Sequence, residues 1–243
     1  MKKIENFLLR EDLLHKKQRL FLYKIPKSLF AIKHTNEIAR VLTRTYTKCI
    51  INKNRHGRTK NMKWLIASDI HGSSYYCEKL INAFNKERAD RIILLGDILY
   101  HGPRNDLPRD YAPKKVIEML NAVSKKLLCV RGNCDCEVDQ MVLDFPVLAD
   151  YAILDLGDRC AFLTHGHVYN LKNLPPLSSG DLLIHGHTHV PACEKLGDIT
   201  YINPGSVSIP KENSHNGYIT LENRKLVWKS LDGEIIENYA YSF

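Results

Sequence analysis

Five short segments of the chain place a carboxylate, imidazole or amide side chain beside glycine. They are Asp69-Ile70-His71-Gly72, Gly96-Asp97, Gly132-Asn133-Cys134-Asp135, Thr164-His165-Gly166-His167 and His185-Gly186-His187-Thr188-His189. Neutral imidazole, carboxylate and amide oxygen suit borderline divalent ions such as Mn, Fe or Zn. The glycine in each segment lets the backbone turn tightly. The residue types therefore point to a metal centre assembled from separate parts of the chain.

The candidate ligands are too many for one ion and about right for two ions that share a bridging carboxylate. They are Asp69, His71, Asp97, Asn133, His165, His187 and His189. A two-metal centre is a known arrangement for attack on phosphate esters. Taken singly, each segment has an ordinary structural explanation, such as a turn for an Asp-x-His pair or a helix N-cap for Gly-Asp. The presence of all five segments in one chain favours the metal centre.

Short apolar runs before these segments predict the strands that position them. In the first half, the pattern predicts strands at 63–68, 91–95 and 127–130, with helices at 77–87 and 114–124 between them. Alternation of strands and helices predicts a parallel sheet. In such sheets, ligand sites gather outside the carboxyl ends of the strands, where we expect the polar segments to meet.

After residue 150 the helical patterns stop. Strands are predicted at 151–156, 160–163, 182–184, 199–202, 217–221, 225–229 and 234–239. They are separated by Gly-Asp, Asn-Arg and Asp-Gly turns. An α/β first half and a mostly β second half predict two sheets packed face to face with helices outside.

The seven cysteines, an odd number without a CxxC pair, indicate free thiols in a reducing, cytoplasmic setting. Cys134 and Cys136 are separated by one residue, a poor geometry for a local disulfide, and a zinc ribbon would need a second pair. The apolar runs are far shorter than the roughly 20 residues of a membrane span, so no transmembrane helix is expected.

Residues 1–61 differ from the rest in charge, with 16 Lys and Arg against 4 Asp and Glu. Helices near 1–23 and 35–47 are predicted there. Three interpretations stay open: a solvated extension, a basic arm that binds nucleic acid or anionic lipid, or upstream sequence outside a native protein that starts at Met62. The expected division is a basic extension at 1–61 and a catalytic domain at 62–243.

The five segments, in this order, resemble the calcineurin-like metallophosphoesterase superfamily, and more narrowly its bacterial YfcE-type phosphodiesterases. The resemblance runs from Met62 to about Gly217 and is carried by SDIHGS, GDILYHGPRN, YAPKKVIE, RGNCDCEVDQM, LTHGH, HGHTHVP and NPGSVSIPK. It implies a four-layer αββα sandwich of two β-sheets flanked by helices. It also implies a phosphoric diester hydrolase that acts on a small phosphodiester.

The resemblance further implies two divalent ions, with Mn expected first and Zn, Fe, Ni or Mg as alternatives. One ion would be held by Asp69, His71 and His189, the other by Asn133, His165 and His187, and Asp97 would bridge them. A hydroxide shared by the two ions would then attack phosphorus.

Cys134 occupies the position where much of the superfamily has a histidine that protonates the leaving group or grips phosphate. A thiol is a poorer proton donor to an alkoxide and brings no positive charge, which predicts weak activity on monoesters with poor leaving groups. The loop after Asp97 offers His101 as an acid and Arg104, with Asn105, as a phosphate ligand.

Three other polar residues near these segments have simpler expected roles. His167 is expected to line the site and His185 to be structural. Asp135 is expected to orient a metal-bound histidine.

Two other functions are weighed against the phosphodiesterase. One is a binding scaffold, as in retromer subunits of the same fold; the full set of seven potential ligands favours an enzyme instead. The other is a nuclease whose nucleic acid contacts depend on residues 1–61. The sequence leaves the oligomeric state, the native metal and the physiological substrate open.

Overall fold

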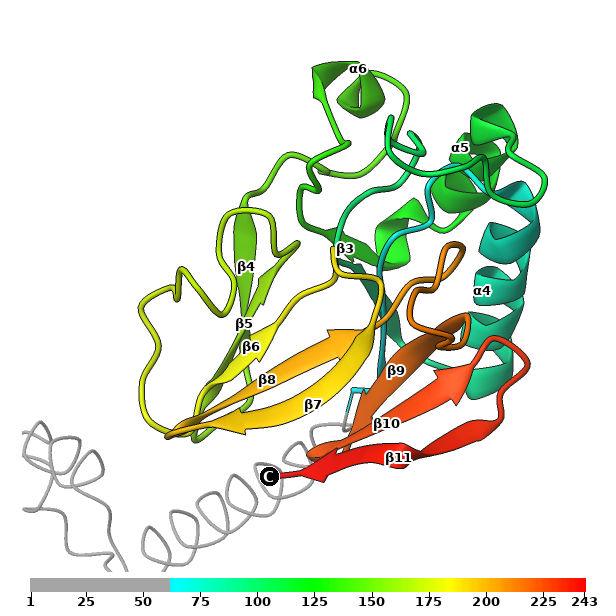
Figure 1. Cartoon of the computed structure of the whole chain (residues 1–243). Coiled ribbons are helices and arrows are strands. Elements are labelled where there is room, and N and C mark those ends of the chain that lie inside the picture. The colour runs from blue at the N-terminus through cyan, green and yellow to red at the C-terminus, as the bar shows by residue number, and fades with distance from the viewer. Residues whose placement is uncertain (1–61) are drawn as a thin grey trace, which may run out of the picture. The chain divides into compact units, whose positions relative to one another are not determined.

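The computed structural model describes residues 62–243, in which strands and helices alternate at first and strands then follow one another (Figure 1). The first part contains β1 (Trp64–Ala67), α4 (Ser74–Glu87), β2 (Arg91–Leu94), α5 (Pro113–Ala122), a 3-10 turn (Ser124–Lys126), β3 (Leu127–Cys129) and the short α6 (Glu137–Gln140). The second part contains β4 (Tyr151–Asp155), β5 (Cys160–Thr164), β6 (Leu182–Ile184), β7 (Pro191–Leu196), β8 (Ile199–Pro204), β9 (Gly217–Glu222), β10 (Lys225–Ser230) and β11 (Ile235–Ser242).

These strands form two mixed sheets. The first has the order β11-β10-β9-β1-β2-β3, and the second has the order β4-β5-β6-β8-β7. In the first sheet β1, β2 and β3 are parallel neighbours, and in the second β5, β6 and β8 are. Parallel neighbours end at the same edge of a sheet, so the loops after β1, β2 and β3 meet there, as do those after β5 and β6.

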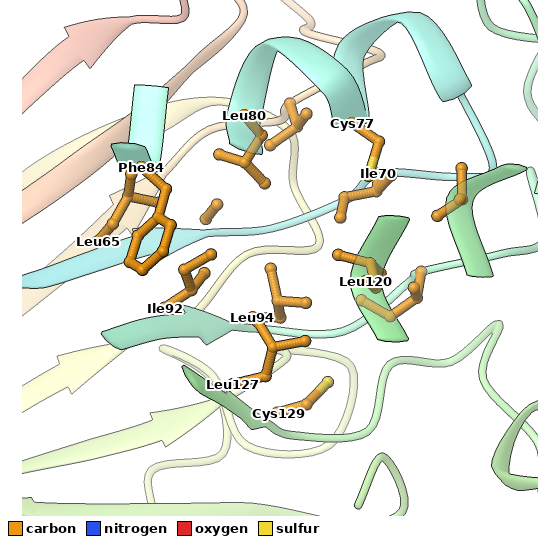
Figure 2. Close-up of a cluster of buried hydrophobic side chains, with 14 of the residues drawn as sticks. Leu65, Ile70, Cys77, Leu80, Phe84, Ile92, Leu94, Leu120, Leu127 and Cys129 are labelled. Atoms are coloured by element: carbon orange, nitrogen blue, oxygen red, sulfur yellow. The ribbon is translucent and has the colours of Figure 1, made fainter. Parts of the chain in front are cut away.

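Alternation along β1 separates two hydrophobic cores. Leu65 and Ala67 belong to a core that the first sheet shares with α4 and α5, whereas Ile66 belongs to a core that includes residues of both sheets. Figure 2 shows the first core, in which Leu80 of α4 and Leu120 of α5 lie over the strand residues. Each such buried Leu or Ile stabilises the fold by about 1.5–3 kcal/mol, so the strand ends project from a rigid base.

The predicted α/β sandwich is confirmed, with one difference in its outer layers. The helices α4 and α5 pack on the first sheet. On the outer face of the second sheet, Phe162 is covered by a loop residue, Tyr169, whose ring meets it edge-on at 5.6 Å. Within residues 62–243, an irregular segment therefore contributes to the layer where the family resemblance implies a helix.

Each strand and helix predicted after residue 62 is present, with small shifts at the ends. α4 begins at Ser74, three residues before its predicted start, because the Ser73 side chain caps it by accepting from the Tyr76 amide. The short α6 and the edge strand β7 were not predicted. β7 starts with proline and carries Glu194 and Lys195, so it lacks a strand-like apolar pattern.

The predicted helices near 1–23 and 35–47 lie outside the described residues. Within 62–243, no helix combines the length and apolar character needed to cross a membrane.

Candidate metal centre

The loops after five strands bring the predicted ligands together. Asp69 and His71 follow β1, Asp97 follows β2, Asn133 follows β3, His165 follows β5, and His187 and His189 follow β6. Ligand atoms of Asp69, His71 and His189 all lie within 4.8 Å of one another. The same holds for Asp69, Asp97 and His165. The expected convergence of the strand ends is present.

The first group centres on Asp69. Its Oδ1 lies 3.2 Å from Nε2 of His189 and 3.6 Å from Nε2 of His71. The two imidazole nitrogens are themselves 3.2 Å apart. One carboxylate oxygen and two ring nitrogens thus face a common point.

The second group centres on His165. Its Nε2 lies 3.0 Å from Oδ1 of Asn133 and 3.1 Å from Nδ1 of His187. Asp97 stands between the groups, because its Oδ2 is 3.4 Å from Nε2 of His165 and 3.6 Å from Nε2 of His71. The seven side chains therefore form two clusters that share one carboxylate oxygen.

Hydrogen bonds on the far side of three rings fix which nitrogen faces the centre. Nδ1 lies 2.7 Å from the Tyr100 carbonyl in His71, 2.7 Å from the Leu95 carbonyl in His165 and 2.6 Å from the Ile209 carbonyl in His189. A carbonyl only accepts, so each Nδ1 carries a proton, and each ring in its neutral form presents the Nε2 lone pair inward.

When the rings are neutral, Nε2 of His71 and Nε2 of His189 face each other at 3.2 Å as two acceptors. The buried Oδ1 of Asp69 also has no hydrogen-bond donor, because the nearby His189 nitrogen offers a lone pair in the neutral ring. Buried acceptors that face one another are costly unless a cation or proton lies between them. The residues present fit divalent metal ions, for which oxygen and imidazole donors are suitable.

The ligand backbone is strained at five of the seven positions. Asp69, His71, Asp97, His187 and His189 all have φ between 49° and 65°. This left-handed region costs a residue with a Cβ about 1 kcal/mol or more and is retained mainly where surrounding structure enforces it. Such a concentration at one point is typical of a functional site.

Serine hydroxyls and a glycine hold the Asp69 loop. Ser206 and Ser208 both donate to the Asp69 carbonyl, at 3.0 and 3.1 Å. A Cβ at Gly186 would lie 1.9 Å from Ser68 Oγ, so the His187 loop can approach only with glycine there. The His187 amide then donates to Oδ2 of Asp69 at 3.1 Å. The two serines were missed as supporting residues, although their NPGSVS segment was part of the family resemblance.

Without a metal, burial opposes a charge on His71, but its contact with Asp69 raises its pKa, and His165 is affected in the same direction. Burial alone would lower the pKa of His165, but the hydrogen bond to Asp97 and the charge of Asp69 raise it to about 9. Burial and the neighbouring His165 lower the pKa of His187 to about 4. The electrostatics of this pocket therefore favour positive charge at its centre and a neutral ring at His187.

Asp135 does not orient a histidine, contrary to the prediction. Its carboxylate accepts three backbone amides, those of Asp97 and Ile98 at 2.8 Å and that of Gly132 at 2.7 Å. The histidines are oriented by main-chain carbonyls instead, which a sequence does not reveal.

Cys134 lies beside the ligands. Its amide donates to Oδ1 of Asp97 at 2.8 Å, and its Sγ is 3.2 Å from Nδ2 of Asn133. Burial and the charge of Asp97 raise the pKa of the Cys134 thiol well above its ordinary value, so the thiol stays protonated. It brings no positive charge to a substrate phosphate.

Two other predicted site residues, His101 and Arg104, lie outside the two clusters of predicted ligands. The His101 ring stands edge-on to Tyr100 and Tyr111, with ring centroids 4.8 and 5.2 Å away. Arg104 is exposed and makes no hydrogen bond or ion pair with the rest of residues 62–243.

His167 and His185 also differ in their surroundings. The His167 ring lies 5.5 Å from that of His165 and 6.4 Å from that of His187. His185 is buried against Tyr201 at 4.5 Å, away from the ligand atoms, as a structural residue would be.

Comparisons with known proteins agree with this geometry. The family model described as the calcineurin-like phosphoesterase superfamily domain matches residues 62–225. The chain is 48% identical to the phosphodiesterase YfcE of Escherichia coli over 175 residues, which cover 72% of this chain and 95% of that protein. A protein of Methanocaldococcus jannaschii named as a phosphodiesterase is 28% identical over 152 residues, covering 59% of this chain and 83% of that one.

A solved structure shows the same fold. It is that of the Escherichia coli phosphoesterase YfcE, with 47% identity, a TM-score of 0.72, and coverage of 74% of this chain and 99% of that chain.

Proposed function

This chain belongs to the calcineurin-like phosphoesterase superfamily and is a hydrolase of phosphoesters, and we propose that it is a phosphodiesterase with a dinuclear metal centre. The observation that carries this proposal is the division of seven ligand side chains into two clusters that share Oδ2 of Asp97. The diester preference is supported by the name of the Escherichia coli relative.

Each cluster would hold one ion. Asp69, His71 and His189 would ligate the first, and Asn133, His165 and His187 the second. Asp97, which lies near both clusters, would be the ligand that they share. Bound ions would supply positive charge that activates the attacking water as hydroxide and stabilises the negative charge developing on phosphate. Mn is the proposed ion, since the donor set suits it and the family resemblance implies it.

The residues of the chain prepare this site before any ion binds. Main-chain carbonyls hold His71, His165 and His189 with their Nε2 atoms inward. Because these partners are backbone atoms of packed loops, the ligand rings need little rearrangement when a metal enters.

The protonated thiol of Cys134 limits the chemistry. A thiol whose pKa is raised by burial is a weak proton donor to an alkoxide, so leaving groups that depart without a proton are favoured. The proposed substrates are therefore small diesters, with aryl esters cleaved fastest. His101 is proposed as an acid for poorer leaving groups, Arg104 as a phosphate ligand and His167 as a lining residue.

The testing experiment compares Mn-dependent hydrolysis of an aryl phosphodiester and its matching monoester by metal-stripped protein, with Asp97→Asn as the control variant. We expect diester turnover that requires Mn and disappears in Asp97→Asn. Absence of ester cleavage by protein that binds two Mn ions would contradict the enzyme proposal. It would instead support the scaffold function, whose partner would then be sought.

The basic segment 1–61 favours one additional activity. Its 16 Lys and Arg, against 4 Asp and Glu, would attract nucleic acid, so the second candidate is a nuclease assisted by this arm. Deleting residues 1–61 should then lower single-strand affinity and flatten its salt dependence. An unchanged affinity and slope would count against the arm.

We also propose that 62–243 is the catalytic domain, separate from the extension at 1–61. A cytoplasmic location is proposed because the six cysteines within the described residues are all free thiols.

A further inference from the structure

The carboxylate of Asp135 ties two active-site loops together. Asp135 is 2% exposed, and its Oδ2 accepts the amides of Asp97 and Gly132 while its Oδ1 accepts that of Ile98. Asp97 and Ile98 belong to the loop after β2, and Gly132 belongs to the loop after β3. One side chain thus satisfies three buried donors from neighbouring strand ends.

The same network controls the orientation of Asp97. Its amide is held by Asp135, and its Oδ1 accepts the Cys134 amide at 2.8 Å. Its φ of 56° is a conformation that needs external support. With the amide and Oδ1 both occupied, Oδ2 is the atom left facing His71 and His165.

The two loops fit together too tightly to allow another arrangement. A Cβ at Gly132 would lie 2.1 Å from Oδ1 of Asp97 and 2.3 Å from its amide nitrogen. The loop after β3 therefore approaches the loop after β2 through bare backbone, and the Asp135 carboxylate is the side chain that closes the contact.

We propose that Asp135 is a positioning residue that fixes the bridging carboxylate of Asp97 and thereby sets the affinity of the paired ions. This inference rests on the proposed function, because it assigns Asp97 to the shared ligand position. Replacing one carboxylate oxygen by an amide nitrogen places a donor against a backbone donor, so Asp135→Asn must leave either the Ile98 amide, or the Asp97 and Gly132 amides together, without an acceptor. Either loss loosens the segment that carries Asp97.

Asp181 provides a matched control in the second sheet. It is 9% exposed, and its carboxylate also accepts two backbone amides at 2.8 Å, those of Cys160 and Ser178. It directly precedes β6, whose opposite end carries the His187 loop. Asp181→Asn should therefore cost similar stability without disturbing a metal ligand.

The experiment measures Mn binding to metal-stripped full-length protein by calorimetry and the spin coupling of the Mn pair by electron paramagnetic resonance. In Asp135→Asn we expect about 10- to 100-fold weaker binding of at least one ion and loss of the coupled-pair signal. Asp181→Asn should bind both ions with wild-type affinity. Amide hydrogen exchange should also accelerate at Ile98, or at Asp97 and Gly132 together, in Asp135→Asn alone.

Wild-type Mn affinity and an intact coupled signal in folded Asp135→Asn would overturn the proposal. If that variant does not fold, Asp135→Glu provides the same test, because it keeps the charge but moves the acceptors by one methylene. Wild-type protein that binds Mn but cleaves no diester would overturn the proposed function alone. The metal affinities and exchange rates would still decide the role of Asp135.

Discussion

The metal centre and a second charged cluster differ in whether the chain itself supplies partners for their buried polar atoms. In the Glu87 cluster, formed by Glu87, Lys63, Tyr218 and Lys229, every polar partner is supplied by the chain. Oε2 of Glu87 is 2.6 Å from Lys63 Nζ, and Oε1 is 2.6 Å from Lys229 Nζ and accepts from the Tyr218 hydroxyl at 3.1 Å. Burial opposes the charge of Glu87, but the two lysines lower its pKa to about 2.

In the metal centre, by contrast, the acceptors face each other and Oδ1 of Asp69 lacks a donor. Five of its ligand residues have left-handed backbone, whereas none of the four residues of the Glu87 cluster does. Charges that serve the fold are paired internally in relaxed backbone. In the metal centre, acceptors that would face a ligand lack a full set of internal donors and lie in strained backbone, whose cost the surrounding packing offsets.

The largest expected effect is the loss of activity in Asp69→Asn, which should leave the stability of the fold nearly unchanged. In Asp69→Asn the remaining oxygen can still accept the His187 amide, and the new amide group can donate to the Nε2 lone pair of His189, 3.2 Å from Oδ1 in the native chain. Mn-dependent diester hydrolysis should fall about a thousandfold, since a ligand carboxylate is lost. The metal-free variant should stay within about 1 kcal/mol of the native protein in stability, because this new hydrogen bond offsets the lost attraction between Asp69 and His165.

Hydrolysis assays and urea unfolding of metal-stripped protein check both parts. Destabilisation of the stripped variant by more than about 1 kcal/mol would show that Asp69 serves the fold, as Glu87 does, and the contrast between the clusters would disappear.

A smaller loss of activity is expected when His101 is replaced, because His101 is predicted to act as an acid and not as a metal ligand. If His101 protonates the leaving group, His101→Ala should lower kcat on an alkyl diester about 10- to 100-fold. On an aryl diester, whose phenolate departs unprotonated, kcat should change by less than about threefold. Mn affinity should be unchanged, because the ring contacts Tyr100 and Tyr111 and none of the predicted ligands. An unchanged kcat on the alkyl diester removes the acid role.

Replacing Glu87 should have the opposite result to Asp69→Asn, because stability should fall while activity is kept. Glu87→Gln should lower the free energy of unfolding at neutral pH by about 1–2 kcal/mol, with diester hydrolysis unchanged. A pKa lowered from 4.5 to about 2 would give about 3 kcal/mol without screening, but the partly exposed lysines reduce it.

The stabilisation by Glu87 should depend on pH. The folded-state pKa is depressed, so this contribution is fully present above about pH 4.5 and is lost as the pH falls towards about 2. Unfolding curves of the native protein and Glu87→Gln should therefore converge in acid. A stability difference that persists at pH 2 would mean that Glu87 acts by packing instead of by charge.

These two clusters also differ in how far the sequence predicts them. The seven predicted ligands could be brought together from the sequence because each segment at a strand end carries a local signal: polar residues and a glycine after an apolar run. The fold class followed from the same runs. β7 was not predicted because, as an edge strand, it tolerates Pro191 and the adjacent charges of Glu194 and Lys195, which hide a strand pattern.

What the sequence could not supply are contacts between distant backbone and side-chain groups. The expected partner of Asp135 was a histidine, yet its acceptors meet amides of Gly132, Asp97 and Ile98. The Glu87 cluster likewise joins α4 to residues more than 100 positions later, with no motif to mark it. Such pairings depend on loop and strand positions that only the assembled sheets define.

The smallest expected loss of stability tests whether the Glu87 carboxylate has more hydrogen-bond donors than it needs. Tyr218→Phe removes one donor from Oε1 of Glu87 but leaves Lys229 on the same oxygen and Lys63 on the other. The loss of stability should be below about 1 kcal/mol, since no buried acceptor is orphaned. In the Glu87→Gln background it should shrink further, because the hydroxyl then meets a neutral amide. Urea unfolding of the two single variants and the double variant measures this coupling. A full-sized loss in both backgrounds would mean that the hydroxyl stabilises the fold independently of Glu87, and the cluster would be two separate contacts.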